Sequence, residues 1–317
     1  MEGLKKGTIV ITGGAGFIGG NLVKQLIKSG NQSIVVIDNQ INKDSIYATE
    51  DLNLKTTLRI ADIRKKELIE EIFSFYNPDF IFHLAAEPIV EEAFDNPYST
   101  FNTNVMGTVN VLNAARKLNN LKAVIVASSD KAYGKTKKAY TEESPLRGDH
   151  PYDVSKSAAD LISLAYHKTY NLPVIVTRFG NVYGEGDFHF GRIIPDICKA
   201  VIKSETLLLR SDGTYVRDYL YVGDVVDGYI FLMKNLNKTI GQAFNFSSKD
   251  TLSVLSLVKK AEKILNTKIK YKILNTAKNE IPYQHLNDAK IRRLGWANKR
   301  SLYVKIEEIL KWYRKVL

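Results

Sequence analysis

With 317 residues, 44% of them hydrophobic and 25% charged, the chain is long enough for one large domain with a smaller lobe, and no polar tract is long enough to indicate disorder. The chain has a net charge of +11, but its basic residues are scattered along the sequence and form no block. This distribution argues against a nucleic-acid-binding protein and favours an anionic small molecule as ligand. The single cysteine, Cys198, excludes an intramolecular disulfide and a cysteine-rich zinc site.

The amino terminus carries no recognisable export or anchoring signal. Its first apolar run, residues 8–11, is far shorter than the roughly 20 residues that a membrane helix requires. Five scattered histidines offer no metal-ligand spacing. We therefore expect a cytoplasmic protein without a metal site, a membrane segment or a nucleic-acid partner.

Short β-branched runs alternate with helical patterns through the first half of the chain. We expect strands at residues 7–12, 33–37, 57–60, 80–84, 123–127 and 174–178. Apolar residues at helical spacing predict helices at residues 17–29, 67–76 and 102–118. Strands buried on both faces that alternate with amphipathic helices are typical of a doubly wound parallel sheet, the Rossmann class of α/β fold.

The second half of the chain is less regular. It contains predicted helices at residues 195–203 and 253–265, and predicted short strands at residues 207–210 and 269–273. We therefore divide the chain into a Rossmann domain, residues 1–180, and a smaller α/β carboxy-terminal lobe, residues 181–317, in which the chain also crosses back to the sheet. The lobe is expected to cover the ligand edge of the sheet and to bind the substrate.

A glycine-rich turn follows the first predicted strand and opens the first predicted helix. Its pattern, Gly13-x-x-Gly16-x-x-Gly19, permits a tight turn, close approach of the backbone to a pyrophosphate and close packing of the helix. Asp38 follows the second strand, where a carboxylate binds both ribose hydroxyls and repels a 2′-phosphate. The pattern predicts a dinucleotide site that prefers NAD to NADP.

Two further strand ends extend this predicted site. Asp62 and Ile63 follow the third strand, where they either flank the adenine or cap the next helix. Leu84, Ala85 and Ala86 end the fourth strand with small residues that leave room for a cofactor. His83 precedes them, and we expect it to be a buried histidine with satisfied hydrogen bonds rather than a ligand.

Ser129, Asp130 and Lys131 precede a Tyr-x-x-x-Lys pair, Tyr152 and Lys156. Residues four apart on a helix share a face, so we expect the Lys156 ammonium to lower the pKa of the Tyr152 phenol and to hold the nicotinamide ribose. Tyr152 is then able to take a proton from a sugar hydroxyl as hydride passes to NAD. The same pair also occurs on surface helices, but its place after Asp130 in a dinucleotide fold indicates redox chemistry on a bound sugar.

Over nearly its whole length the chain resembles the extended short-chain dehydrogenase/reductase family, specifically the nucleotide-sugar 4,6-dehydratases and their epimerase relatives. The matching segments are Thr12-Gly-Gly-Ala-Gly-Phe-Ile-Gly19, His83-Leu-Ala-Ala86, Asn104-Val-Met-Gly-Thr108, Ser128-Ser-Asp-Lys131, Pro151-Tyr152-x-x-x-Lys156, Arg178-Phe-Gly-Asn-Val-Tyr-Gly184 and Arg217-Asp-Tyr-Leu-Tyr-Val222.

The resemblance implies a lyase that oxidises carbon 4 of the sugar, removes water across carbons 5 and 6, and returns hydride to carbon 6. It implies that Tyr152 is the base for oxidation, Ser129 binds the 4-hydroxyl and Asp130 protonates the departing 6-hydroxyl. Lys131 would remove the carbon-5 proton, which requires a neutral amine. The family also implies a homodimer through the helices at residues 102–118 and 152–170, and a role in deoxysugar biosynthesis for cell-surface polysaccharide.

The resemblance also implies residues that bind the cofactor and the substrate. The expected NAD-binding residues are Gly13, Gly16, Phe17, Ile18, Gly19, Asp38, Asn39, Asp62, Ile63, Leu84, Ala85, Ala86, Asn104, Tyr152 and Lys156. The expected substrate-binding residues are Glu87, Asn181, Arg192, Arg210 and Arg217. For Glu87 a place at a helix entry is an open alternative, and for Arg217 an ion pair with Asp218.

The identity of the substrate is open at this point. Ser-Asp-Lys resembles the CDP-glucose and UDP-N-acetylglucosamine 4,6-dehydratases, whereas the dTDP-glucose enzymes carry glutamate at the position of Lys131. Tyr283-Gln284-His285 stands where many relatives place an arginine for the phosphate. We expect a UDP- or CDP-linked glucose or N-acetylglucosamine. The alternatives are a nucleotide-sugar 4-epimerase, in which Asp130 and Lys131 are only loop residues, and a catalytically silent NAD-bound scaffold.

Overall fold

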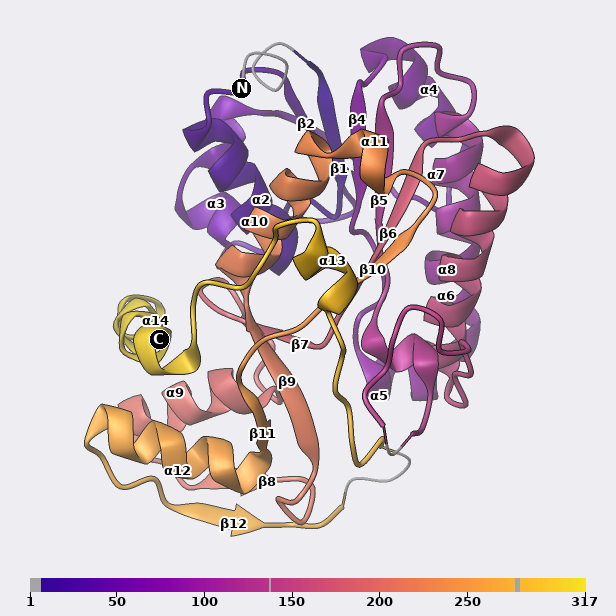
Figure 1. Ribbon diagram of the computed structural model, residues 1–317. Helices are drawn as coiled ribbons and strands as arrows, with labels where there is room; N and C mark the ends of the chain where they lie inside the picture. The colour runs from indigo at the N-terminus through magenta and orange to yellow at the C-terminus, as the bar shows by residue number, and fades with distance from the viewer. Residues whose placement is uncertain (1–6, 137, 277–279) are drawn as a thin grey trace.

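A parallel sheet of seven strands forms the centre of the molecule (Figure 1), in the order β10-β6-β5-β4-β1-β2-β3. The computed structural model describes residues 7–136, 138–276 and 280–317, so the first six residues of the predicted Rossmann domain lie outside the described residues. The strands are β1 (Ile9–Thr12), β2 (Ile34–Asp38), β3 (Thr57–Ile60), β4 (Phe80–His83), β5 (Ala123–Ala127), β6 (Val174–Phe179) and β10 (Ala243–Phe246). The predicted doubly wound sheet is confirmed, with β10 as a strand that the sequence patterns did not predict.

Helices cover both faces of the sheet. α2 (Phe17–Lys28) and α10 (Val222–Lys234) pack on one face, and α4 (Lys66–Tyr76), α7 (Gly107–Ala115) and α8 (Pro151–Tyr170) pack on the other. Neighbouring residues of β1 enter opposite cores, Ile9 and Ile11 on the α2 side and Val10 on the α7 side. The expectation of strands buried on both faces is wrong for β3, because it is an edge strand and leaves Ile60 60% exposed.

Shorter elements connect this framework. They are α3 (Ile46–Thr49), η1 (Leu52–Lys55), α5 (Val90–Asp95), α6 (Pro97–Phe101), η2 (Asn102–Met106), η3 (Asp130–Tyr133), α11 (Leu236–Thr239) and α13 (Ala289–Arg293). The helix expected at residues 102–118 begins as the π-helical turn η2, continues as α7 and ends earlier than predicted. Among the described residues, none of the helices combines the length and the apolar character that a membrane crossing needs.

The remaining elements form a smaller α/β lobe beyond the carboxyl edge of the sheet (Figure 1). Its strands are β7 (Asn181–Tyr183), β9 (Val216–Tyr221) and β11 (Thr251–Ser253) in one sheet, and β8 (Leu207–Leu209) and β12 (Tyr271–Ile273) in a parallel pair. α9 (Ile193–Lys203), α12 (Val254–Leu265) and α14 (Leu302–Val316) enclose a third core. Between these elements the chain returns to the sheet as α10 and β10, while the division at residue 180 remains a proposal.

The strand order places the site. Thr12 at the end of β1 lies beside Ile37 of β2 and His83 of β4, so the carboxyl ends of these strands are level. The chain runs outward in one direction through β2 and β3 and in the other through β4, β5 and β6. Ligands of such sheets bind where the direction reverses, at the carboxyl ends of β1 and β4.

Candidate active site

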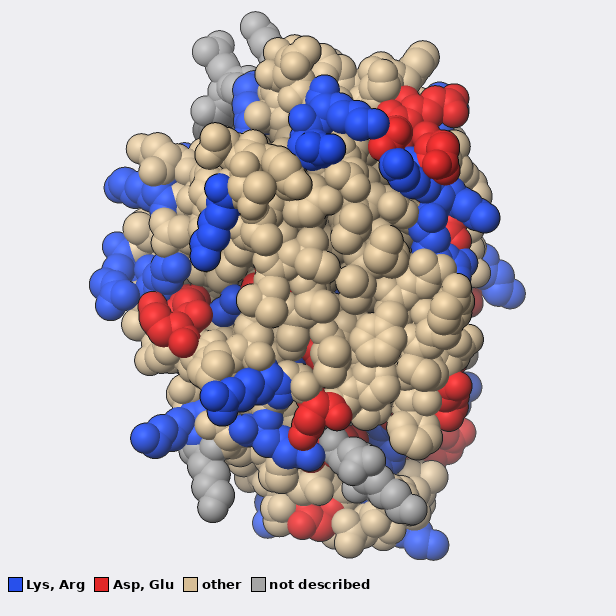
Figure 2. Space-filling view, turned by 90° about the vertical axis from the view of Figure 1, so that its right-hand side faces the viewer, with Lys and Arg blue, Asp and Glu red and all other residues tan. Residues whose placement is uncertain are grey.

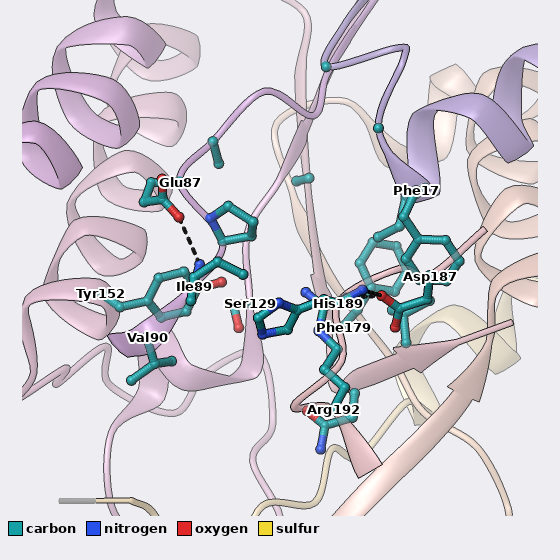
Figure 3. Close-up of a pocket in the computed structure, with 18 of the residues that line it drawn as sticks. Phe17, Glu87, Ile89, Val90, Ser129, Tyr152, Phe179, Asp187, His189 and Arg192 are labelled. Carbon is teal, nitrogen blue, oxygen red and sulfur yellow. Dashed lines mark hydrogen bonds and ion pairs between the residues drawn. The ribbon is translucent and has the colours of Figure 1, made fainter. Parts of the chain in front are cut away.

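A cavity of about 830 Å³ lies at this reversal point, between the carboxyl edge of the sheet and the lobe. Every catalytic and substrate-binding residue predicted from the sequence lines it, as does every predicted cofactor residue except Asn104. Figure 3 shows residues from both parts facing one another, with Tyr152, Glu87 and Ser129 on the sheet side and Asp187 and Arg192 on the lobe side. The fold therefore collects residues that are far apart in sequence into one site.

The glycine turn is shaped for a pyrophosphate. Gly13 has φ +71°, and a Cβ there would lie 2.7 Å from the backbone nitrogen of Ala85. A Cβ at Gly19 would lie 2.1 Å from the Gly13 carbonyl oxygen, so only glycine lets α2 start so close to β1. The Asp38 carboxylate accepts a hydrogen bond from the Ala15 amide at 3.0 Å beside this turn. These residues fit a dinucleotide whose ribose reaches Asp38.

Asp62 lies in the cavity wall, but its carboxylate already has a partner. Arg64 pairs with it at 2.6 Å, and this hydrogen bond lowers the pKa of Asp62. The Arg64 amide also donates to Asp62 at 2.8 Å, as in a turn cap. The carboxylate therefore stabilises the turn at Arg64. Its contact with an adenine remains a proposal.

Asn104 does not line the cavity. It is buried, its Oδ1 accepts from the Glu87 amide at 2.7 Å, and its Nδ2 donates to the Glu87 carbonyl at 3.1 Å and to Ser155 at 2.9 Å. These three bonds engage both ends of its amide. In this structure Asn104 thus holds the Glu87 loop beside α8 instead of standing at the wall where NAD would bind.

His83 is confirmed as a buried histidine with satisfied hydrogen bonds. Its ring nitrogens lie 2.8 Å from the Thr12 hydroxyl and 2.9 Å from the Thr108 hydroxyl. Burial lowers its pKa to about 3, so the ring is neutral. It ties the ends of β1 and β4 to α7.

Tyr152 and Lys156 stand on the first turns of α8. Pro151 occupies the first helical position, and the His150 ring caps the helix by accepting from the Tyr152 amide at 3.3 Å. Lys156 donates to the Ala127 carbonyl at 3.2 Å, and burial lowers its pKa to about 8. The expected depression of the Tyr152 pKa is wrong for this structure, because burial raises it to about 12 and outweighs the hydrogen bond from Ser129.

The Asp130 carboxyl group lies at the centre of the site and is only 4% exposed. Ser129 caps η3 and donates to Oδ1 of Asp130 at 3.2 Å, while Gln284 donates to Oδ2 at 3.0 Å. Burial raises the pKa of Asp130 to about 6, despite the opposing charges of Lys131 and Arg217. Near neutral pH this carboxyl group is therefore able to hold a proton and to release it, as a general acid must.

Lys131 is half-buried in the cavity wall, next to this carboxyl group. Its charge lowers the pKa of Asp130 and that of Asp153, a second buried carboxyl group whose pKa burial raises to about 6. The amine thus lies close enough to both carboxyl groups to act on them through its charge. Its assignment as a base remains a proposal.

Arginines occupy the lobe side of the cavity. Arg217 is buried and pairs with Glu280 at 3.0 Å, whereas its neighbour Asp218 bonds His285 at 2.8 Å, so the alternative Arg217–Asp218 ion pair is not formed. Arg192 pairs with Asp187 at 3.0 Å. These carboxylates hold the guanidinium groups at the cavity, where an incoming diphosphate would meet them.

The remaining predicted substrate residues lie around the mouth of the cavity. Arg210 pairs with Glu91 across the cleft and donates to the Gly191 carbonyl at 2.9 Å. Asn181 begins β7 and lies in the cavity wall. Glu87 is half-buried and accepts from the Ile89 amide at 3.1 Å (Figure 3), and burial raises its pKa.

Sequence patterns did not single out Asp187, His189 or Gln284 as site residues. Asp187 and His189 follow β7 and face the cavity (Figure 3), but no spacing rule marks an irregular loop as part of a site. Gln284 reaches Asp130 across 154 residues of sequence, which only the folded chain reveals. Within the described ranges, no cluster of histidine, cysteine, aspartate or glutamate has the geometry of a metal site.

Comparison with known proteins shows that the chain is similar to sugar-nucleotide enzymes. Residues 9–246 match the family described as NAD dependent epimerase/dehydratase family. The trifunctional UDP-glucose 4,6-dehydratase/UDP-4-keto-6-deoxy-D-glucose 3,5-epimerase/UDP-4-keto-L-rhamnose-reductase of Arabidopsis thaliana is 29% identical over 96% of this chain, which spans about half, 46%, of that protein. The CDP-glucose 4,6-dehydratase of Salmonella typhimurium is 28% identical over 96% of this chain and 90% of its own length.

Two solved structures superpose closely. The dTDP-glucose 4,6-dehydratase of Streptomyces venezuelae with NAD and TYD bound has a TM-score of 0.88 and 28% identity over 97% of each chain. The UDP-glucose 4-epimerase of Thermotoga maritima with UDP-glucose has a TM-score of 0.87 and 29% identity over 97% of this chain and 99% of its own. Overall similarity therefore does not separate the two reactions, nor the nucleotide bases of their substrates.

Proposed function

Because this chain belongs to the NAD dependent epimerase/dehydratase family and its cofactor is NAD, we propose that it is a nucleotide-sugar 4,6-dehydratase. The proposed reaction converts a UDP- or CDP-linked glucose or N-acetylglucosamine into the 4-keto-6-deoxy sugar with release of one water. The observation that carries this proposal is Asp130, a buried acid beside Ser129 and Tyr152 whose pKa burial raises to about 6. Oxidation alone needs no such acid, whereas loss of the 6-hydroxyl does.

Ser129, Tyr152 and Lys156 serve the oxidation at carbon 4. NAD, which the glycine turn and Asp38 would hold, would supply a hydride acceptor for carbon 4 and a hydride donor for carbon 6. The Tyr152 oxygen accepts the proton of the 4-hydroxyl, which Ser129 orients through its own hydroxyl. Since burial raises the pKa of Tyr152 to about 12, the phenolate depends on groups that oppose this shift, and in this structure these are the Ser129 hydrogen bond and the Arg192 charge.

Asp130 and Lys131 serve the elimination. The ketone at carbon 4 acidifies the proton on carbon 5, which the Lys131 amine removes. The electron pair forms the double bond between carbons 5 and 6 as the carbon–oxygen bond at carbon 6 breaks. Asp130 protonates the departing hydroxyl, and the Lys131 ammonium returns its proton to carbon 5 when hydride arrives at carbon 6.

The proton balance of this cycle points to Ser129. After one turnover Tyr152 has gained a proton and Asp130 has lost one. The Ser129 hydroxyl hydrogen-bonds Tyr152 and donates to Asp130 at 3.2 Å, so it forms a path along which the proton returns without bulk water. The same residue thus supports both halves of the reaction.

The substrate class follows from the lobe side. Arg192 and Arg217 are proposed to bind the diphosphate, because a guanidinium matches phosphate oxygens in bidentate geometry. Arg210, at the mouth, is proposed to stack on the pyrimidine once it leaves Glu91. The cofactor and substrate contacts of the other predicted residues, which line the same cavity, belong to this proposal.

Product analysis tests the proposal. The purified protein is incubated separately with UDP-N-acetylglucosamine, UDP-glucose and CDP-glucose without added reductant, and the products are followed by mass spectrometry. A product lighter by one water identifies both the reaction and the substrate. No change in mass together with a new configuration at carbon 4 by NMR identifies a 4-epimerase.

The epimerase is the second candidate, and a specific observation supports it. The chain is as similar to the Thermotoga epimerase as to the dehydratases, and Ser129, Tyr152 and Lys156 suffice for transient oxidation at carbon 4. In that case Asp130 would serve only to order η3. If none of the three sugars reacts although each binds, the silent NAD-bound scaffold is favoured instead.

We also propose that the protein is a homodimer. Figure 2 shows a broad face whose centre is free of lysine, arginine, aspartate and glutamate, on the side where α6, α7 and α8 lie in Figure 1. Apolar side chains are exposed on α6, on α8 and on the π-helical turn η2 that precedes α7, among them Tyr98 (81%), Met106 (49%), Leu161 (57%) and Tyr170 (52%). A second copy packed helix against helix would cover this face.

A cytoplasmic location completes the proposal. Cys198 is buried and unpaired, which suits a reducing compartment. Fractionation of producing cells checks this, and recovery of the protein from a membrane or external fraction would contradict it.

A further inference from the structure

The side-chain amide of Gln284 meets the carboxyl group of Asp130 inside the protein. Gln284 is fully buried, and its Nε2 donates to Oδ2 of Asp130 at 3.0 Å. The other oxygen, Oδ1, accepts from Ser129 at 3.2 Å. Each carboxyl oxygen thus accepts one hydrogen bond, Oδ2 from the Gln284 amide and Oδ1 from the Ser129 hydroxyl.

The chain around Gln284 is firmly anchored. The Gln284 amide nitrogen donates to the Val216 carbonyl at 3.1 Å, and the Leu286 amide donates to the Asp218 carboxylate at 2.8 Å. Tyr140 and Leu286 form a further bridge between chain segments. The segment is therefore hydrogen-bonded to β9 on one side and to the loop after η3 on the other. These contacts fix the Gln284 backbone beside Asp130.

The side-chain carbonyl oxygen of Gln284, Oε1, is evidence against a purely structural role for this residue. Within the part of the chain that the structure describes, Oε1 of Gln284 is buried without a hydrogen-bond partner. An unpaired buried carbonyl is costly, and a glutamine that only filled space would be replaced by an apolar side chain at no loss. The bond to Asp130 is the one side-chain hydrogen bond recorded for Gln284 in these ranges.

We infer that Gln284 is a positioning residue for the general acid, which confines the acidic proton to Oδ1 of Asp130. This inference rests on the proposed dehydratase function. The Gln284 N–H group that points at Oδ2 can only donate, so a proton on Oδ2 would face another donor, whereas the Ser129 hydroxyl can rotate and accept a hydrogen bond from a proton on Oδ1. The proton therefore resides on Oδ1, next to Ser129 and at the end of the path from Tyr152.

The placement of the two oxygens supports this assignment. Oδ2 lies toward Gly180, since a Cβ built on that glycine would be 3.6 Å from it, and toward Gln284. Oδ1 lies toward the Ser129 hydroxyl, which also bonds Tyr152. With Oδ2 held by Gln284, each turnover presents the proton from the same atom to the departing 6-hydroxyl.

The first test measures the proton on Asp130 directly and needs no turnover. The protein is labelled with ¹³C at aspartate carboxyl carbons, and the Asp130 signal is assigned by its loss in Asp130→Asn. Gln284→Leu removes the donor to the ionised carboxylate, so the titration midpoint of Asp130 should rise by about one to two pH units. Gln242→Leu is the matched control, because Gln242 donates to the Lys238 carbonyl outside the cavity, and it should leave the midpoint unchanged.

The second test separates the steps of the reaction. Oxidation at carbon 4 uses Tyr152 and should continue in Gln284→Leu, whereas elimination should slow about 10- to 100-fold. Reduced cofactor, followed by its absorbance after mixing with substrate, should then accumulate in the variant and not in Gln242→Leu. Gln284→Met, of similar length, replaces the leucine variant if that one does not fold.

The two tests distinguish the ways of failing. If the wild-type protein dehydrates none of the sugars but the Asp130 midpoint shifts as expected, the proposed function is wrong while the coupling of Gln284 to Asp130 stands. If the midpoint does not move, or if oxidation and elimination slow equally, Gln284 does not position the acid and the inference is overturned.

Discussion

The Ser129 hydroxyl donates to Oδ1 of Asp130 at 3.2 Å and hydrogen-bonds Tyr152 as well. One side chain thus connects the phenol proposed to take a proton at carbon 4 with the carboxyl group proposed to give one at carbon 6. In the proposed dehydratase Asp130 acts in the elimination, whereas in the alternative 4-epimerase it would only order η3.

Asp130→Asn should separate oxidation from elimination. The amide cannot donate an acidic proton to the 6-hydroxyl, so the rate of dehydration should fall by at least about 100-fold. Oxidation at carbon 4 uses Tyr152 and should persist, so reduced cofactor should accumulate on mixing with substrate. Absorbance of the reduced cofactor and product mass measure the two steps.

A control for this variant lies nearby. Asp153→Asn makes the same change at a buried carboxyl group whose pKa burial also raises to about 6, but which does not line the cavity. It should dehydrate at close to the wild-type rate. Full dehydration by Asp130→Asn would remove Asp130 from the mechanism and favour the epimerase.

The two halves of the reaction should respond to pH in opposite directions. Burial raises the pKa of Asp130 to about 6, so the protonated acid is lost as pH rises through that value and elimination slows. Burial raises the pKa of Tyr152 to about 12, so its reactive phenolate increases over the same range and oxidation speeds up. Transient reduced cofactor should therefore increase from about pH 6 to about pH 8, and a decrease would contradict both assignments.

Leu161→Glu should yield a monomer. Leu161 is 57% exposed on α8, one of the helices of the proposed dimer face, and a carboxylate there would be buried without a partner in the proposed dimer. Light scattering measures the change in mass. Leu54→Glu is the control, because Leu54 is 77% exposed on η1, away from this face, and its substitution should leave the mass unchanged. A wild-type monomer would refute the proposed dimer.

Asp160→Ala should destabilise the fold strongly. Arg178 donates two hydrogen bonds to Asp160 at 2.8 Å, and both side chains are at least 97% buried. Removing the carboxylate leaves a buried guanidinium without its counter-charge, so unfolding by urea should show a loss of about 3–5 kcal/mol. Lys24→Ala breaks the exposed Lys24–Glu50 pair and should cost less than about 1 kcal/mol. Equal losses for the two variants would contradict the burial argument.

Much of the sheet was predictable because local patterns determine it. A few neighbouring residues are enough to determine a β-branched strand, the glycine turn and the helix that follows it. The sequence patterns therefore predicted β1, α2 and the position of Asp38 at the carboxyl end of β2. The second half of the chain was less predictable. α10, α14 and β10 were missed, and the helix at residues 102–118 starts as a π turn, because packing against distant parts of the chain decides such elements.

Local sequence patterns specify which chemical groups the site contains, namely the glycine spacing, Ser129-Asp130-Lys131, and Tyr152 with Lys156. The protonation of these groups and their hydrogen-bond partners depend on the folded chain. Burial raises the pKa of Tyr152 where the sequence suggested that Lys156 would lower it, and Asn104 turns from the cavity to Glu87. Gln284 reaches Asp130 from 154 residues away, since desolvation and long-range hydrogen bonds depend on what the folded chain places around a group and not on its neighbours in sequence.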